Sequence, residues 1–513
     1  MVTEQTSSPS IVRRQASRRA FLGGTLAAGS LVVAYGSLGD PLHLVPGAET
    51  NAVARGDANA IEKEGVRISH LLRRAGFGAN AAEHQRYQAM GLEATIDELV
   101  NFASINDDEA VGLFTKALSE PGNRVSPAVP WLIRMANTRR PLQEKMTLFW
   151  HGLLTSQLSM VREPAAMVGQ NEFFRAHAFD TFPSILRGIS MDRAMMVYLN
   201  VDGSVRRAPN ENYARELMEL FSLGEGNYSE EDVREAARAF TGWQVPRNRN
   251  DAGVVSLGEP VLRREQFDDG EKTFLGVTGN FRPDDIVDII AKQPAAGAYI
   301  TRRLFSYFVF PNPTEKDLEP FIRVYDQSGG SIGAVVEAML RSDIFYSPRA
   351  YRSMVKSPVE YVISAAKAVG LESTLGQMAI LGPRGNGGVL GDMGQIPFEP
   401  PNVAGWPGGA QWLNSATFFA RLNFINQLTG DAPLARGDQQ QQPPPAHFAL
   451  AESLGTTSQA LDYYLPLAVD GNLPREGYEV LTKYAGGSRA PLTAESLRGL
   501  VYLVLGSPQF HLS

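Results

Sequence analysis

The 513-residue chain contains no cysteine. Without a thiol it can form no disulfide, no thiolate nucleophile and no Cys-ligated zinc, iron–sulfur or P450-type haem site. Histidine is also scarce, with seven residues. Neither a His-Glu-x-x-His nor a Glu-x-x-His pattern occurs, so zincin and di-iron sites of those kinds are not expected. No cofactor is predicted from these absences.

A concentrated basic region is also lacking. The net charge is −7, and the 48 lysine and arginine residues are scattered along the chain. A nucleic-acid partner is therefore not expected, because such partners need a basic surface that neutralises phosphates. The composition, 43% hydrophobic and 20% charged, is that of an ordinary globular protein. It is sufficient for a large core, as one big domain or as two packed lobes.

Long hydrophobic runs are absent except near the N-terminus. Residues 17–22 read SRRAFL, with Arg18 and Arg19 ahead of an apolar stretch that reaches about Tyr35. This layout predicts a twin-arginine signal peptide over residues 1–35, and a Sec signal or an uncleaved anchor is the alternative. We expect export to the periplasm, the cell envelope or the outside. Contact with a membrane is expected only through this segment, if it stays uncleaved.

The remainder of the chain is typical of a mainly α protein. Residues 36–65 resemble a flexible linker, and 66–513 form a large multi-helix domain in our interpretation. A small β-hairpin insertion is expected at about 244–275, with a turn at Asp269-Gly270. A low-complexity loop is expected at 436–446, around QQQQPPP. Alternating βαβ patterning is absent, which argues against Rossmann and TIM-barrel folds.

Helical spacing and end signals predict many individual helices. Among them are 142–154, 173–186 and 209–224, the last bounded by a proline and a glycine. Ser229 and Asp232 predict a capping box for a helix that runs to Phe240. Residues 329–333 read GGSIG, which matches the pattern of a nucleophile elbow. A helix rather than a strand precedes them, so Ser331 is interpreted as a helix N-cap.

Several long motifs resemble one bacterial family. They are 70–78 (HLLRRAGFG), 149–151 (FWH), 210–221 (NENYARELMELF), 232–243 (DVREAARAFTGW), 272–276 (KTFLG), 401–409 (PNVAGWPGG) and 412–414 (WLN). Together they are similar to the domain-of-unknown-function 1800 family, over about residues 67–513. The resemblance implies an exported protein whose gene often lies beside that of a second exported family, domain of unknown function 1501. It implies no catalytic residues.

The sequence departs from that family pattern at two positions. Leu153 stands where the family usually has a histidine two residues after the one resembling His151. Phe267 stands where a histidine often precedes the Asp-x-Gly of the hairpin. If relatives use those imidazoles as metal ligands or as acid–base groups, we expect that this chain has lost the capacity.

The helix over 209–224 carries the main candidate chemistry. Glu211 and Glu219 lie on one face with Arg215 between them, and Glu216 lies beside this row. Such carboxylates could act as acid and base, with Glu216 and Glu219 as catalytic candidates. They could also bind Ca²⁺ or Mg²⁺ with Asp202 of the preceding loop. The structural alternative is a Glu–Arg ladder that joins neighbouring helices, and this alternative is favoured.

The other candidates are a histidine and an aromatic loop. His151 follows Phe149 and Trp150, and a lone histidine among aromatic residues is more often a packing residue than a catalyst. The loop that holds Asn402, Trp406 and Trp412 could stack on sugar rings or anchor a partner. Burial of the two rings in the core is the favoured alternative.

The leading functional hypothesis is therefore a non-enzymatic exported protein. It would bind or assemble with another exported protein, plausibly of the 1501 family. The first alternative is an envelope hydrolase or metal-dependent enzyme that acts on a polymer, built around Glu216, Glu219 and His151. The second alternative is a polysaccharide-binding module, which requires Trp406 and Trp412 to be exposed.

Overall fold

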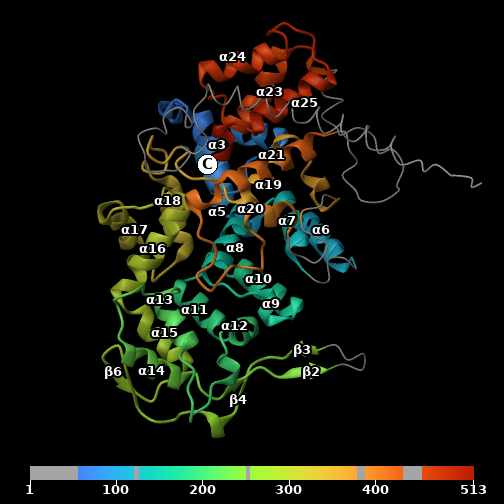
Figure 1. Cartoon of the computed structure of the whole chain (residues 1–513). Coiled ribbons are helices and arrows are strands. Elements are labelled where there is room, and N and C mark those ends of the chain that lie inside the picture. Colours follow the sequence, from blue (N-terminus) through green and yellow to red (C-terminus); the bar gives the residue numbers. More distant parts are fainter. Residues whose placement is uncertain (1–55, 121–125, 250–254, 378–379, 381–386, 431–452) are drawn as a thin grey trace, which may run out of the picture.

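The computed structural model describes residues 56–120, 126–249, 255–377, 380, 387–430 and 453–513, and it is mainly helical (Figure 1). The expected fold class is therefore confirmed. Arg18, Arg19 and the low-complexity loop at 436–446 lie outside the described residues. Within the expected linker, residues 58–62 form a 3₁₀ helix, η3 (Ala58–Glu62), whose first turn is capped by Asp57.

The helices follow one another with short connections. Those of the first half are α3 (Glu64–Arg74), α4 (Ala81–Met90), α5 (Leu92–Val100), α6 (Asp108–Ser119), α7 (Ala128–Asn137), α8 (Pro141–Leu153), α9 (Leu158–Val161), α10 (Pro164–Ala176), α11 (Phe182–Ser190), α12 (Arg193–Tyr198), α13 (Asn212–Glu219) and α14 (Glu230–Ala239). Those of the second half are α15 (Pro283–Ala291), α16 (Pro294–Phe308), α17 (Glu315–Gln327), α18 (Ile332–Arg341), α19 (Pro358–Ala368), α20 (Gly388–Met393), α21 (Ser415–Thr429), α23 (Thr457–Val469), α24 (Arg475–Tyr484), α25 (Ala494–Leu505) and α26 (Pro508–His511). Further 3₁₀ turns are η4 (Phe102–Ser104), η6 (Val201–Gly203), η7 (Arg264–Gln266), η8 (Glu372–Gln377) and η9 (Gly409–Trp412).

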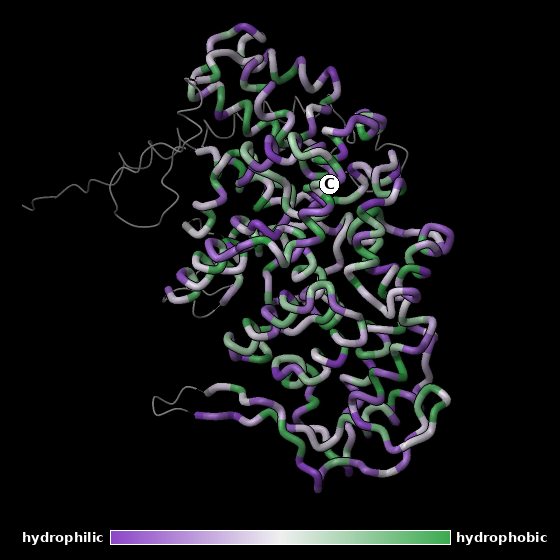
Figure 2. The backbone as a smooth tube through the Cα atoms, turned by 180° about the vertical axis from the view of Figure 1, so that it is seen from behind, coloured by the Kyte–Doolittle hydropathy of each residue, from purple (hydrophilic) through white to green (hydrophobic). Residues whose placement is uncertain are grey.

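Three small antiparallel ribbons lie between α14 and α15. Strand β1 (Trp243–Gln244) pairs with β4 (Val261–Leu262), β2 (Arg247–Arg249) pairs with β3 (Val255–Leu257), and β5 (Lys272–Phe274) pairs with β6 (Val277–Gly279). The tight turn of the last ribbon is Leu275-Gly276. The expected turn at Asp269-Gly270 instead precedes β5. The β2–β3 ribbon projects from the body, and β2, whose three residues are exposed, is purple in Figure 2.

Local signals set most helix ends correctly. Ser229 and Asp232 form the expected capping box of α14, and the Ser331 side chain accepts a hydrogen bond from the Ala334 amide at the start of α18. Helix α13 ends at Glu219, and Gly224 then takes a positive φ of 79° while its amide bonds to Met218. Gly224 therefore ends this helical segment as expected, by means of a left-handed turn.

The single helix expected over 173–186 is wrong. Helix α10 ends at Ala176 and α11 begins at Phe182, so a short connection separates them. The Thr181 side chain caps α11, and Pro183 lies in its first turn. Apolar residues continue through the connection at helical spacing, which hides the break. Thr181 as the N-cap, with Pro183 two residues later, is the signal of a new helix start.

One hydrophobic cluster extends from Ala60 to Phe510 and joins most of the helices. One group of buried polar side chains within it is tightly paired. The Glu144 carboxylate on α8 accepts from Trp131 Nε1 at 2.8 Å and from Arg175 Nε at 2.5 Å, and it pairs with Arg134 at 3.1 Å. Burial alone would raise the pKa of Glu144, but the two guanidinium groups outweigh it and hold the pKa low. This group therefore ties α7, α8 and α10 together.

Segments far apart in the chain meet at one end of the molecule. Helices α23, α24 and α25 form the top in Figure 1, beside α3, while α11 to α15 and the ribbons form the bottom. Arg73 on α3 forms an ion pair with Asp470, the residue that ends α23. Among the described residues, no helix is both long enough and apolar enough to span a membrane.

Candidate functional site

His151 lies inside the core near the end of α8. Its ring is 1% exposed, and its Nε2 accepts a hydrogen bond of 2.9 Å from the Phe398 amide. Aromatic rings surround it, with centroids 5.1 Å away for Trp131, 4.9 Å for Phe398 and 5.6 Å for Trp406. Burial lowers the pKa of His151 to about 3. The ring is therefore neutral at ordinary pH, and its acceptor nitrogen is already in use.

The hydrogen bond from Phe398 is one of several that attach the 398–406 loop to α8 and to the residues after it. The Leu158 amide donates to the Phe398 carbonyl at 2.8 Å, and the Thr155 hydroxyl donates to the Val403 carbonyl at 2.7 Å. Gly405 lies so close to α8 that an added Cβ would stand 2.3 Å from the Gly152 carbonyl oxygen. His151 thus positions the loop against α8.

Trp406 lies in this loop, and Trp412 lies just beyond it in η9. Trp412 is 7% exposed and packs with Val355 and Leu512, and Trp406 is half-buried against this cluster. Asn402 is exposed, and its side chain accepts from the Ala404 amide within its own turn. The polysaccharide-binding alternative needs both rings exposed, and burial of Trp412 does not meet that condition.

Arg215 organises the acidic face of α13. It pairs with Glu211 at 3.3 Å and with Glu230 of α14 at 2.7 Å. Glu219 accepts from the Tyr228 hydroxyl at 2.8 Å. This is the Glu–Arg ladder between neighbouring helices that the spacing favoured. Since these groups are largely exposed, each pair contributes only about 0–1 kcal/mol.

Glu216 differs from its neighbours on α13. Partial burial and the nearby Glu219 raise its pKa, and Arg215 opposes the shift. The pKa of Tyr198 is raised mainly by burial and also by the charges of Glu216 and Glu399. These three side chains therefore lie near one another. The contacts of His151 are aromatic rings and a backbone amide rather than these carboxylates. The structure therefore does not join His151 to Glu216 and Glu219 as one catalytic group.

The metal-binding candidates are likewise separate. Asp202 pairs with Arg247 of β2 at 3.0 Å, while Glu211 pairs with Arg215. In the part of the chain that the structure describes, no group of three or more His, Asp or Glu is arranged to hold a metal ion. The two departures from the family pattern are both buried: Leu153 is 3% exposed in the main core, and Phe267 is 9% exposed beneath the Lys272 ammonium group.

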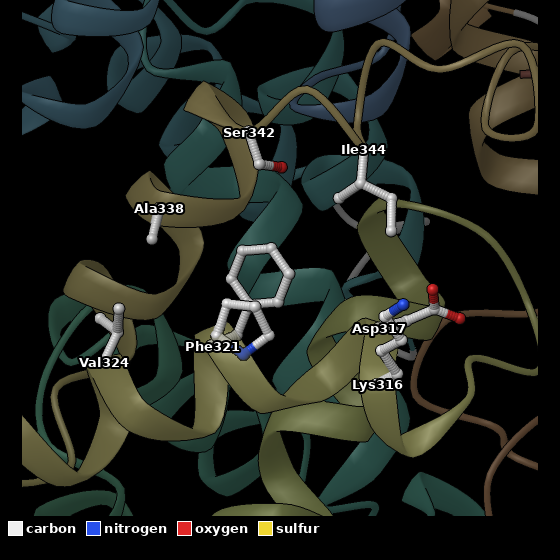
Figure 3. Close-up of a pocket in the computed structure, with 8 residues that line it drawn as sticks. Lys316, Asp317, Phe321, Val324, Ala338, Ser342 and Ile344 are labelled. Atoms are coloured by element: carbon white, nitrogen blue, oxygen red, sulfur yellow. The ribbon is translucent and has the colours of Figure 1, made fainter.

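A groove lies between α17 and α18. Its volume is about 610 Å³, and Lys316, Asp317 and Ser342 are its polar lining residues. Five apolar residues line the rest: Pro320, Phe321, Val324, Ala338 and Ile344. Figure 3 shows the Phe321 ring at the centre, with Val324 and Ala338 on one side and Ile344 and Asp317 on the other. The groove therefore has an apolar floor with charge at one end.

Pro320 gives this groove a polar feature as well. It lies inside α17 and has no N–H, so it cannot donate to the Lys316 carbonyl one turn earlier. That carbonyl is left without its helical donor at the charged end of the groove. The signal for this feature in the sequence is a proline inside an otherwise helical pattern.

Comparison with known protein families shows which family the chain is related to. The family described as "Protein of unknown function (DUF1800)" matches residues 70–512. The chain belongs to this family. The match covers nearly all of the described residues, from the HLLRRAGFG motif in α3 to the last helix. No curated protein and no solved structure matches the chain.

Membership in the DUF1800 family supplies no activity, because the family is itself one of unknown function. The residues with chemical potential must therefore be judged by their surroundings in this structure. In the part of the chain that the structure describes, two features combine open volume with mixed chemistry, as a binding site requires. They are the groove between α17 and α18 and a smaller cavity beside the HLLRRAGFG motif.

Proposed function

We propose that this DUF1800 protein is exported and binds another exported protein through the groove between α17 and α18. The observation that carries the proposal is the apolar lining of this groove, where Val324, Ala338 and Ile344 are partly exposed around the buried ring of Phe321. Its volume of about 610 Å³ lies within the usual range of binding pockets, roughly 300–1,000 Å³. The occupant is an amphipathic helix of the partner, inserted as apolar anchors.

The charges at one end of the groove specify the orientation of that helix. Asp317 is already paired with Arg349 at 3.1 Å, whereas Lys316 is exposed. A carboxylate near one end of the partner helix would meet Lys316, and an N–H or hydroxyl donor would meet the Lys316 carbonyl. We propose the neighbouring exported family, domain of unknown function 1501, as the source of this partner.

Binding to that partner tests the proposal directly. A purified protein of the 1501 family is titrated against wild type and against Ala338→Glu, which places a carboxylate in the apolar lining. We expect a loss of affinity of about tenfold or more, since a charge would be buried without a pair. Lys316→Glu should also weaken binding through repulsion. Ala494→Glu, an exposed helical alanine on α25, is the matched control and should bind normally.

Two outcomes would overturn this function. One is a wild-type protein that does not bind the partner at all. The other is an Ala338→Glu variant that binds as tightly as wild type while remaining folded by circular dichroism.

Export by the twin-arginine route is a separate part of the proposal. It rests on Arg18 and Arg19 in the SRRAFL motif. Replacing both with lysine should retain the protein in the cytoplasm, as judged by cell fractionation. Unchanged export would instead favour a Sec signal.

A further inference from the structure

The HLLRRAGFG motif ends in a turn that only glycine can make. Gly78 has a φ of +82°, which favours glycine. At Gly76 an added Cβ would lie 3.0 Å from both the Leu72 carbonyl oxygen and the Pro141 Cβ. The two glycines therefore let the chain leave α3 close to the start of α8. Both glycines line a cavity at this point.

This cavity has a volume of about 120 Å³. Leu72, Gly76 and Gly78 of the motif form one wall, and residues from α4, α5, the α7–α8 connection and α19 form the others. A water molecule occupies about 30 Å³ in the liquid, so the cavity can hold a ligand of only a few heavy atoms. Apolar burial of so small a molecule contributes little free energy, so charge must provide most of the affinity.

The polar lining of the cavity is rich in cations. Lys367 of α19 is 3% exposed, and its Nζ donates to both carboxylate oxygens of Glu83 at 2.9 Å. An ammonium group has three donors, so one is left for a ligand. Arg86 is paired with Glu98 outside the cavity at 2.7 Å. These two pairs leave the lining neutral apart from the remaining arginine.

Arg139 is that remaining cation. Its backbone amide donates to Asp107 at 2.7 Å, which fixes the chain at the cavity, while its side chain is exposed. Within the described ranges, no carboxylate forms an ion pair with the Arg139 guanidinium group. The cavity therefore has one positive charge in excess, from a group that forms paired hydrogen bonds with planar or tetrahedral oxyanions.

We propose that this cavity binds a small oxyanion, a carboxylate or a phosphate group, between the Arg139 guanidinium group and the Lys367 ammonium group. The glycines of the HLLRRAGFG motif then serve to bring α3 and the start of α8 together as walls of the cavity. This site is separate from the groove between α17 and α18, and it does not rest on the proposed protein-binding function. Loss of one binding activity leaves the other intact.

Calorimetric titration of the full chain tests this site, with inorganic phosphate and acetate as two separate probes. We expect a one-to-one complex with at least one of them. Binding of phosphate alone identifies phosphorylated ligands, and binding of acetate alone identifies carboxylates. Arg139→Gln should lower the affinity about tenfold or more, since a charge-assisted hydrogen bond is lost. Arg139→Lys, which keeps the charge, should lose less.

The control is Arg207→Gln, which removes one exposed arginine outside the cavity. It should leave the affinity unchanged. The proposal is overturned if neither anion binds, if Arg139→Gln binds as wild type does, or if Arg207→Gln weakens binding to the same extent. Because Arg139 is exposed, its replacement should not unfold the protein, and thermal unfolding of each variant verifies this.

Discussion

At the scale of single residues, the surroundings of each buried histidine ring decide its protonation state. His151 combines full burial with an accepted amide hydrogen bond, so its neutral form is fixed in place. His70 on α3 is similar. Burial, with Arg74 and Arg73 nearby, lowers its pKa well below the usual value. Both rings therefore stay neutral at neutral pH, because protonation would place an unpaired charge in the core.

The lowered pKa of His151 predicts a loss of stability in acid. The unfolded ring has a pKa of about 6.5, and the folded ring has one of about 3. The unfolded state therefore takes up the proton first. The contribution is fully present above about pH 6.5 and decreases by about 1.4 kcal/mol per pH unit as the pH falls towards 3.

Chemical denaturation of wild type and His151→Gln between pH 7 and pH 4 measures this contribution. We expect the difference in unfolding free energy between the two proteins to shrink as the pH falls, because only the wild type carries the His151 dependence. Curves that remain parallel over this range would show that His151 is not held neutral by burial.

At the scale of elements, the 398–406 loop is held by a close backbone approach rather than by its tryptophans alone. Gly405 has a φ of +79°, and its missing Cβ leaves room for the Gly152 carbonyl. Phe398 also has a positive φ, of 68°, which is unusual for a bulky residue. The hydrogen bonds from Phe398 to His151 and from Leu158 to Phe398 hold this conformation in place.

Gly405→Ala should therefore displace the loop from α8. The clash with the Gly152 carbonyl adds to the penalty of a left-handed alanine, so we expect a loss of at least about 2 kcal/mol in thermal or urea unfolding. Gly409→Ala is the matched control: φ is +58° there, but an added Cβ meets no atom within 4 Å. It should cost only about 1 kcal/mol, for the backbone conformation alone. Equal losses at the two positions would contradict the close approach.

Across the whole molecule, basic side chains are buried more often than acidic ones. Ten lysine and arginine residues in the described part of the chain are buried: Arg73, Arg74, Arg134, Lys145, Arg175, Lys272, Arg352, Lys356, Lys367 and Arg421. Only Asp107, Glu144 and Asp268 are buried acidic residues by the same measure. Several of these cations pair with carboxylates whose residues remain partly exposed: Arg73 with Asp470, Lys145 with Glu360 and Lys367 with Glu83.

The buried cations near α3 depend on one carboxylate from the other end of the chain. Asp470 pairs with Arg73 and with Arg352 at 3.4 Å, and it accepts from the Tyr351 hydroxyl at 2.8 Å. Burial would raise the pKa of Asp470, but the two arginines outweigh it and lower the pKa. The carboxylate therefore stays charged and joins α23 to α3.

Asp470→Asn should leave two buried arginines without a counter-charge. We expect a loss of about 3–5 kcal/mol in unfolding free energy, as for other broken buried ion pairs. Hydrogen exchange should show the largest loss of protection in α3 and in α23, and less in α13 to α15. Asp462→Asn, on the exposed face of α23, is the control and should have little effect. A uniform loss over all helices would contradict a local joint at Asp470.

Sequence alone predicted the mainly α fold, most helix positions and several caps, such as Ser229 and Ser331, because these depend on neighbouring residues. It also predicted the Arg215 ladder, whose partner Glu211 lies one turn away. The break between α10 and α11 was missed because apolar spacing continues through it. Thr181 and Pro183 do indicate a helix start, but the continuous apolar spacing outweighed this local signal.

Tertiary structure alone decided which residues meet across the chain. Arg73 and Asp470 are 397 positions apart, and Lys367 meets Glu83 across 284 positions. No periodicity encodes such pairs, because they depend on how helices pack rather than on how each one forms. For the same reason the groove at Phe321 and the cavity at Gly76 could not be predicted. Their walls come from separate elements, and only packing brings those elements together.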